Sequence, residues 1–167
     1  MLLPIKAMPL ILMASLTIAG AQAQETVLAF EGLRAASAEP MEITADRLEA
    51  SQKDLTAIFT GNVQVSQGGM HLSADSVRVN YAPGAQNQID QMLASGNVLL
   101  STPSEAAQAA EATYSLKDHM LVMEGEVLLT QAGNVMSGSM LTVDVTNGTG
   151  RMEGRVTTVL QPAGNNP

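Results

Sequence analysis

Apolar and polar residues alternate with a period of two over much of the chain between residues 41 and 162. In residues 56–67, small or apolar residues at every second position are separated by Thr, Asn and Gln. This period places alternate side chains on opposite faces of a β-strand, so that one face is buried and the other meets water. Because the pattern recurs around residues 75–81, 92–100, 121–129 and 141–145, the sequence predicts an all-β chain of half-buried strands.

A glycine interrupts the alternation at Gly61, Gly96, Gly125 and Gly154, which lie 35, 29 and 29 residues apart. A period of this length indicates stacked supersecondary repeats. Glycine weakens the interior of a strand unless the strand bulges or bends there. We therefore expect each repeat to bend at its glycine, so that the stacked repeats fold over into two facing sheets. The simpler alternative is that the glycines only end the strands.

A second set of residue pairs recurs along the chain with nearly the same period. These pairs are Ala45-Asp46, Ala74-Asp75, Ala110-Glu111 and Gly138-Ser139. The longer step between the second and third units indicates an extra loop, for which residues 83–88 and 103–104 are the candidates. The recurring acids Asp46, Asp75 and Glu111 raise the question of calcium binding. The glycine-rich repeat that such sites need is missing, so hydrogen bonding to the backbone at the corners is the favoured interpretation.

The first 23 residues have the pattern of a secretory signal peptide. Lys6 precedes an apolar run over residues 8–19, and Ala21-Gln22-Ala23 supplies a small-residue cleavage site. The run is interrupted by Pro9 and is shorter than the roughly 20 residues that span a bilayer. Cleavage after Ala23 is therefore predicted, and a retained membrane anchor is the second interpretation.

The remaining chain is acidic and poor in aromatic residues. The sequence has no Cys, no Trp, two Phe and two Tyr, and its net charge of −8 becomes −9 when Lys6 is removed with the signal peptide. An acidic surface repels phosphate-rich polymers, which argues against nucleic acid as a partner. We expect residues 24–39 to form a flexible leader, residues 40–162 the folded domain and residues 163–167 a C-terminal tail.

Three segments resemble the OstA-like family of periplasmic lipopolysaccharide transport proteins, of the LptA type. Residues 40–46 (PMEITAD), 59–79 (FTGNVQVSQGGMHLSADSVRV) and 155–162 (RVTTVLQP) are similar to its opening strand, its most characteristic run and its closing strand. The resemblance implies an open, twisted antiparallel β-jellyroll in the periplasm that holds the acyl chains of lipid A between its sheets. It implies neither an enzymatic step nor a cofactor.

The resemblance also implies partners at both ends of the domain. An LptC-like inner-membrane protein would meet the N-terminal edge, an LptD-like outer-membrane protein would meet the C-terminal edge, and head-to-tail self-association is allowed. Edge strands with unpaired backbone groups invite strand addition, and contact between two different edges grows open chains. The predicted partner edges are Met41, Glu42, Ile43 and Thr44 at one end and Val156, Thr157, Thr158, Val159 and Leu160 at the other.

The predicted interior is soft because Ala and Met take the place of aromatic residues. Met side chains are flexible and polarisable, which suits acyl chains; the alternative is that they fill gaps in a dry core. The residues predicted to face inward and bind lipid are Met41, Ile43, Phe59, Val63, Val65, Leu72, Val77, Val79, Tyr81, Met92, Val98, Leu100, Tyr114, Leu121, Met123, Val127, Leu129, Met136, Leu141 and Val143.

Catalytic and metal-binding interpretations are weaker. Glu124 and Glu126 flank Gly125, but they share the outer face of the strand and no third group converges on them. His71 and His119 lack the spacing of a metal-binding pair. Two other interpretations stay open, namely an LptC-like adaptor that keeps its N-terminal segment as a membrane anchor, and a structural β-scaffold with a dry core.

Overall fold

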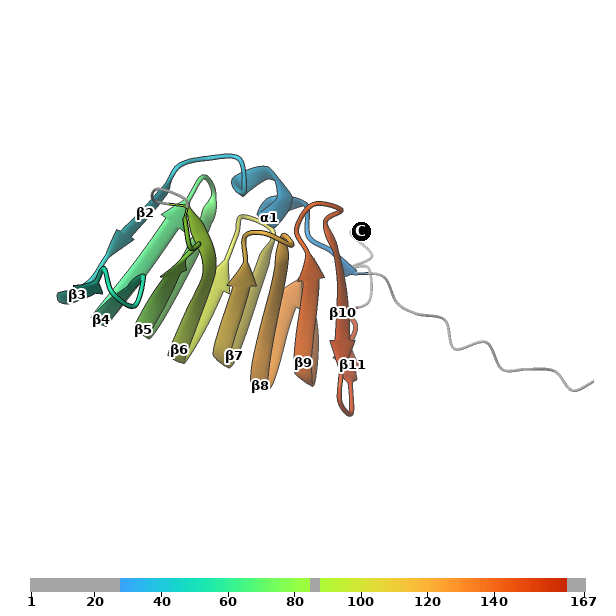
Figure 1. Cartoon of the computed structure of the whole chain (residues 1–167). Helices are drawn as coiled ribbons and strands as arrows, with labels where there is room; N and C mark the ends of the chain where they lie inside the picture. Colours follow the sequence, from blue (N-terminus) through green and yellow to red (C-terminus); the bar gives the residue numbers. More distant parts are fainter. Residues whose placement is uncertain (1–27, 85–87, 162–167) are drawn as a thin grey trace, which may run out of the picture.

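An antiparallel sheet dominates the computed structural model, which describes residues 28–84 and 88–161 (Figure 1). Within these residues, strands pair in the order β1-β10-β9-β8-β7-β6-β5-β4-β2, with β3 also beside β4 and β11 also beside β9. The elements are β1 (Leu28–Ala29), α1 (Glu31–Ala36), β2 (Met41–Thr44), β3 (Arg47–Ser51), β4 (Thr56–Gln67), β5 (Met70–Tyr81), β6 (Ile89–Ser101), β7 (Glu105–Ser115), β8 (Met120–Gln131), β9 (Asn134–Asp144), β10 (Thr149–Glu153) and β11 (Thr157–Val159).

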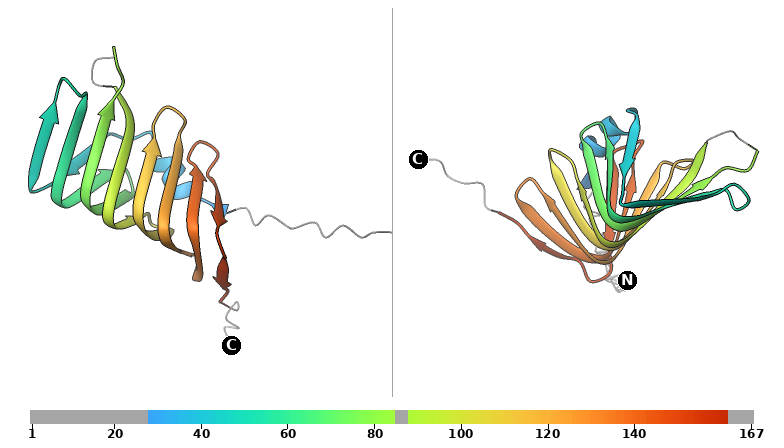
Figure 2. Two further views of the ribbon diagram at one scale, coloured as in Figure 1. Left: turned by 60° about the horizontal axis from the view of Figure 1, so that its bottom comes forward. Right: turned by 90° about the vertical axis from the view of Figure 1, so that its left-hand side faces the viewer.

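Every second long strand, namely β4, β6 and β8, contains a β-bulge made of a glycine and the residue after it. In β4 the pairing register shifts between Thr60 and Val63, and Gly61 and Asn62 have φ angles of 79° and 47°. The same arrangement recurs in β6 and β8, and the right-hand view of Figure 2 shows the strands bent into a V. The predicted bend is therefore confirmed, although its two halves belong to one continuous sheet. The prediction of an open, twisted antiparallel β-jellyroll is also confirmed.

The bends divide the sheet into two arms. The β3–β10 arm contains β3, β10 and the halves of β4 to β9 that are in register with them; the β2–β11 arm contains β2, β11 and the other halves. The predicted edge residues 41–44 and 156–160 thus lie at opposite ends of the β2–β11 arm, with Val156 and Leu160 just outside β11.

A side chain from the neighbouring strand packs against the bulge in the first two repeats. Asn62 Nδ2 donates a hydrogen bond to Asp46 Oδ2 over 2.7 Å, and Asn97 Nδ2 donates one to Asp75 Oδ2 over 2.9 Å. Asparagine tolerates positive φ better than most residues, and these bonds hold it there. The two aspartates therefore form hydrogen bonds at the corners, but each carboxylate accepts from an asparagine side chain and not, as the sequence predicts, from the backbone.

The third repeat differs from the sequence prediction by one residue. Ala110 lies against the bulge, because an added Cβ on Gly125 would be 2.7 Å from the Ala110 Cβ. Glu111, which was expected at this position, instead pairs with Glu124 across the strands. The prediction for Glu111 is wrong because acidity alone was used to align the repeat, whereas the spacing from the glycine sets the register.

The segment before β2 is folded against the sheet, so the prediction of a flexible leader is wrong for residues 28–39. β1 pairs with β10, and Phe30, Leu33 and Ala36 are buried. The alternating pattern could not reveal this packing because these residues contact the tips of strands rather than one neighbouring strand. The predicted signal peptide (1–23), residues 24–27, the loop residues 85–87 and the tail (163–167) lie outside the described residues.

Replacing Gly96 with Ala should destabilise the fold more than the same change at Gly84. Both glycines have positive φ, 76° and 78°, so each Ala costs about 1 kcal/mol in backbone strain. At Gly96 the new Cβ would also lie 2.9 Å from the Asp75 Cβ, whereas nothing lies within 4 Å of it at Gly84. We expect urea unfolding to show losses of roughly 2–4 kcal/mol for Gly96→Ala and about 1 kcal/mol for Gly84→Ala. Equal losses would show that the corner is not sterically constrained.

Candidate functional site

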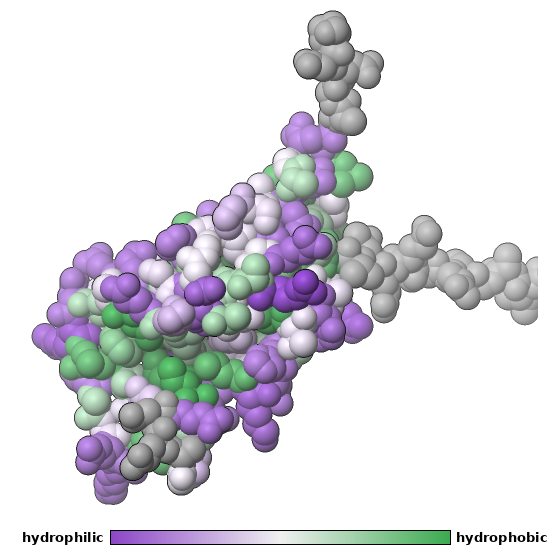
Figure 3. Space-filling model, turned by 90° about the horizontal axis from the view of Figure 1, so that it is seen from above, coloured by the Kyte–Doolittle hydropathy of each residue, from purple (hydrophilic) through white to green (hydrophobic). Residues whose placement is uncertain are grey.

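An apolar groove lies between the two arms, beneath α1. Its empty volume is about 570 Å³, including the part open to solvent. Seen from above, hydrophobic surface gathers between hydrophilic rims (Figure 3). The fifteen lining residues are Leu33, Ser37, Met41, Val65, Gln67, Met70, Leu72, Val77, Met92, Ala94, Leu100, Ala112, Tyr114, Leu121 and Val145.

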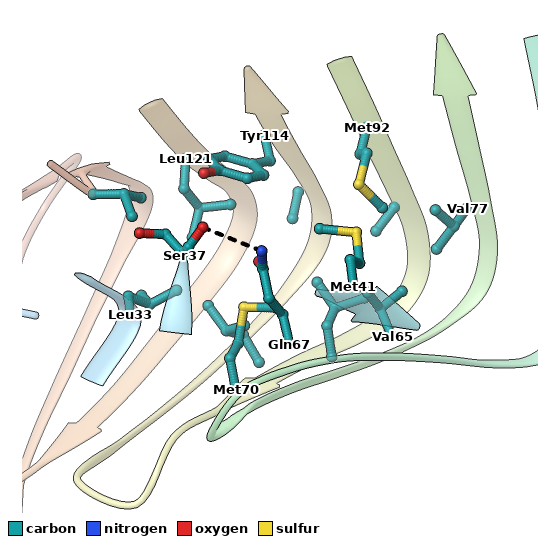
Figure 4. Close-up of a pocket in the computed structure, with 15 residues that line it drawn as sticks. Leu33, Ser37, Met41, Val65, Gln67, Met70, Val77, Met92, Tyr114 and Leu121 are labelled. Carbon is teal, nitrogen blue, oxygen red and sulfur yellow. Dashed lines mark hydrogen bonds between the residues drawn. The ribbon is translucent and has the colours of Figure 1, made fainter. Parts of the chain in front are cut away.

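Small side chains make room in the middle of the groove. Val77, Ala94 and Ala112 are successive cross-strand neighbours in β5, β6 and β7, and all three line the groove. Because an alanine side chain ends at Cβ, this row does not fill the space between the arms. Met41 and Met92 extend toward that space with their flexible thioethers (Figure 4). The surface of the groove is thus both apolar and adaptable.

The structure brings eight of the predicted inward-facing residues together in the groove. They come from β2, β4, β5, β6, β7 and β8, so residues up to 80 positions apart in sequence share one surface. These residues are Met41, Val65, Leu72, Val77, Met92, Leu100, Tyr114 and Leu121.

The other predicted residues also face the interior, but they lie outside the groove. Ile43, Phe59 and Tyr81 are half-buried against the core. The remaining nine are buried in the core: Val63, Val79, Val98, Met123, Val127, Leu129, Met136, Leu141 and Val143. Contact of these residues with lipid stays a prediction that their burial does not favour.

Sequence reasoning missed seven of the lining residues, for three different reasons. Met70, Ala94, Ala112 and Val145 continue the alternation of predicted neighbours, so a strict count by twos along each strand would have found them. Gln67 keeps the alternation of Val63 and Val65, but its side chain is polar, so a search for apolar positions passes over it. Leu33 and Ser37 come from the segment taken for a flexible leader, and only tertiary packing places them over the groove.

The interior is filled where β8, β9 and β10 meet. Met123, Leu129, Leu141 and Val143 are completely buried, and Phe30 is only 1% exposed. The Phe30 ring packs on Gly150, where an added Cβ would collide with the ring. The C-terminal half is therefore a close-packed core, while the N-terminal half keeps the groove.

Among the described residues of the groove, Tyr114 is the one whose pKa is shifted. Burial raises the pKa of the Tyr114 phenol above its ordinary value, because a phenolate loses hydration in the apolar groove. The groove therefore disfavours charge. Among the described residues, no group of three or more His, Asp or Glu side chains is arranged to hold a metal ion, and Glu124, Glu126, His71 and His119 are exposed.

The fold and the site together define the class of domain: an open antiparallel β-jellyroll with an apolar groove between its two arms. The chain belongs to the LptA/(LptD N-terminal domain) LPS transport protein family, whose model matches residues 42–149. The match covers β3 to β9 in full, all of β2 except its first residue, and all the lining residues except Leu33, Ser37 and Met41. This family is described as one of transport proteins, in agreement with the resemblance seen in residues 40–46 and 59–79.

Two relatives extend the comparison. An uncharacterised protein of Rhizobium meliloti (strain 1021) is 33% identical over 159 residues, which cover 89% of this chain and 86% of the relative. The crystal structure of LptH, described as the LptA homologous periplasmic component of the lipopolysaccharide transport device of Pseudomonas aeruginosa, has a TM-score of 0.68 at 18% identity. That match covers 76% of this chain and 99% of LptH. The described part of the chain contains no helix of the length and apolarity needed to cross a membrane.

The Tyr114→Phe variant should lose less stability than the wild type at high pH. Burial holds the Tyr114 pKa above that of an unfolded tyrosine, which is about 10. The stabilising contribution of the neutral phenol is therefore complete below pH 10 and is lost as the pH rises through the raised pKa. Urea unfolding at pH 8 and at pH 11 would measure this difference. An equal loss in both proteins between these pH values would show that the Tyr114 hydroxyl does not contribute.

Proposed function

We propose that this protein is a periplasmic carrier that holds the acyl chains of lipopolysaccharide in the groove between its arms. The observation that carries this proposal is the apolar groove itself, whose lining contains no charged side chain. Membership of a lipopolysaccharide transport family supports this ligand, and the description of LptH as a periplasmic component supports the compartment.

The energetics of the groove suit a carrier. Removing a methylene group from water is worth about 0.8 kcal/mol, so an acyl chain of a dozen carbons gains on the order of 10 kcal/mol. This gain in free energy requires only that the groove is apolar and wide enough for the chain, and it requires no specific polar contact. Transfer to a second groove of the same kind exchanges one apolar environment for another. The free energy therefore changes little between neighbouring carriers, as a path between two membranes requires.

The edges of the β2–β11 arm support a bridging role. Within the described residues, β2 pairs only with β4 and β11 pairs only with β9, so each has one edge without a neighbouring strand. All three residues of β11 are exposed. Exposed apolar side chains come from Val159 within β11 and from Val156 and Leu160 on either side of it. An LptC-like protein at β2 and β3, and an LptD-like protein at β11, would extend the sheet and continue the groove toward the outer membrane.

The Met70→Glu variant should bind lipopolysaccharide at least tenfold more weakly than the wild type. Met70 lines the groove but is only half-buried, so the fold should tolerate the change while the charge opposes an acyl chain. The matched control is Met120→Glu, which places the same charge on a half-buried methionine of β8 outside the groove. Titration with fluorescently labelled lipopolysaccharide would measure both affinities. Binding lost equally in both variants, or absent from the wild type, would favour the structural scaffold.

Single charges at the two edges should block self-association, and mixing the variants should restore one contact. Leu48 in β3 and Val159 in β11 are 56% and 55% exposed. We expect Leu48→Lys and Val159→Lys each to be monomeric at concentrations where the wild type forms chains, because lysine on an edge opposes strand addition. A 1:1 mixture should give dimers and nothing larger, since each variant keeps one intact edge. Sedimentation would show this result; a mixture that stays monomeric would contradict head-to-tail contact.

A further inference from the structure

Residues 28–40, here called the strap, cross the mouth of the V from one arm to the other. Figure 1 shows the strap running from β10 over the top of the sheet, through α1, to β2. Leu33 and Ser37 of the strap form part of the wall of the groove (Figure 4). The strap therefore covers the groove rather than lying beside it.

The start of the strap is anchored beside β10. Leu28 and Ala29 pair with Gly150 and Thr149, and the Phe30 amide donates a hydrogen bond to the Gly148 carbonyl over 2.7 Å. The absence of a side chain at Gly150 leaves room for the Phe30 ring, which is 1% exposed. The Phe30 ring, here called the Phe30 plug, is therefore buried beside β10 at the C-terminal end of the sheet.

The other end of the strap rests on the tip of the β2–β11 arm through weaker contacts. Gln67 Nε2 donates to the Glu39 carbonyl over 2.8 Å and to the Ser37 carbonyl over 3.3 Å. Ala36 packs against the turn at Gly68, whose added Cβ would lie 3.5 Å from the Ala36 Cβ. α1 itself is held over the groove by the burial of Leu33 and Ala36 and by the packing of Gly32 on the Thr102 and Glu105 side chains. The Gln67 side chain provides the hydrogen bonds that tie the end of α1 and the residues after it to the sheet.

The strap is locally less stable than the sheet beneath it. α1 has six residues and no side-chain hydrogen bond at its N-cap, and helices this short are not stable alone in water. The strands below are paired on both sides over eleven or more residues. The free-energy cost of local opening is therefore lowest at α1, which lies between two fixed points, Phe30 and β2.

We propose that the strap is a lid: α1 lifts to admit an acyl chain and closes over it with Leu33 and Ala36. This inference rests on the proposed function, since it describes access to the same groove. Met70 and Gln67 at the rim would meet the chain first, and Leu33 would exchange its contacts with the groove for contacts with the lipid. The Phe30 plug would meanwhile keep the chain from leaving through the C-terminal end until a partner binds there.

A disulfide between Ala36→Cys and Gly68→Cys would lock the lid. The Cβ separation of 3.5 Å lies within the range of disulfides, and the natural chain has no cysteine to interfere. We expect uptake of fluorescently labelled lipopolysaccharide by the oxidised protein to be at least tenfold slower than by the reduced protein. Protein loaded while reduced and then oxidised should release the lipid at least tenfold more slowly. The two single-cysteine variants under the same oxidant are the controls.

The outcomes separate the lid from the carrier function. If the wild type and the reduced variant bind lipopolysaccharide but oxidation changes neither uptake nor release, the lid is overturned and the carrier function stands. If no form binds lipopolysaccharide, the carrier function itself fails. Gln67→Ala is a second variant that needs no disulfide: removing both hydrogen bonds to the strap should make uptake about threefold faster or more, and an unchanged or slower rate would contradict the lid.

Discussion

The bulge at each glycine is the constraint on which the rest of the molecule depends. A glycine and its successor, both at positive φ, turn β4, β6 and β8 at a shift in the pairing register, as at Gly61-Asn62 and Gly96-Asn97. Because neighbouring strands bend at the same place, the corners stack and the whole sheet folds along one line. Without this line the inward faces would not oppose one another, and neither a core nor a groove would form. The Asp46 and Asp75 carboxylates reinforce the corners in the first two repeats.

One sheet serves two purposes because the size of its inward side chains changes along its length. Around Met123, Leu129 and Leu141 the arms fill the space between them completely and supply a dry core. Around Ala94 and Ala112 they do not, and an apolar groove remains. Close packing at one end stabilises the fold, which allows the other end to stay partly empty. The groove is therefore held open by the stability of the core beside it.

The edge strands differ in whether their backbone hydrogen-bonding groups are left without a neighbouring strand. β2 and β11 leave hydrogen-bonding groups at the ends of the β2–β11 arm, which favour the addition of a further strand. β1, in contrast, already occupies the end of β10 next to the Phe30 plug. The C-terminal end therefore offers an open edge on one arm and a covered one on the other.

The alternation and the glycine spacing determined the fold class, the bends, the two edge segments and the inward orientation of residues such as Val65, Met92 and Leu121. These features are local, since a period of two and a residue able to adopt positive φ can both be recognised without knowing the neighbours. Tertiary structure alone decided which inward residues line the groove and which are sealed, because Tyr114 and Val127 obey the same pattern but lie in regions of different packing. It also decided that Phe30, Leu33 and Ala36 are buried and that Leu33 reaches the groove. Their burial depends on the shape of strand tips that are brought together only when the whole sheet has folded, and no periodicity records that shape.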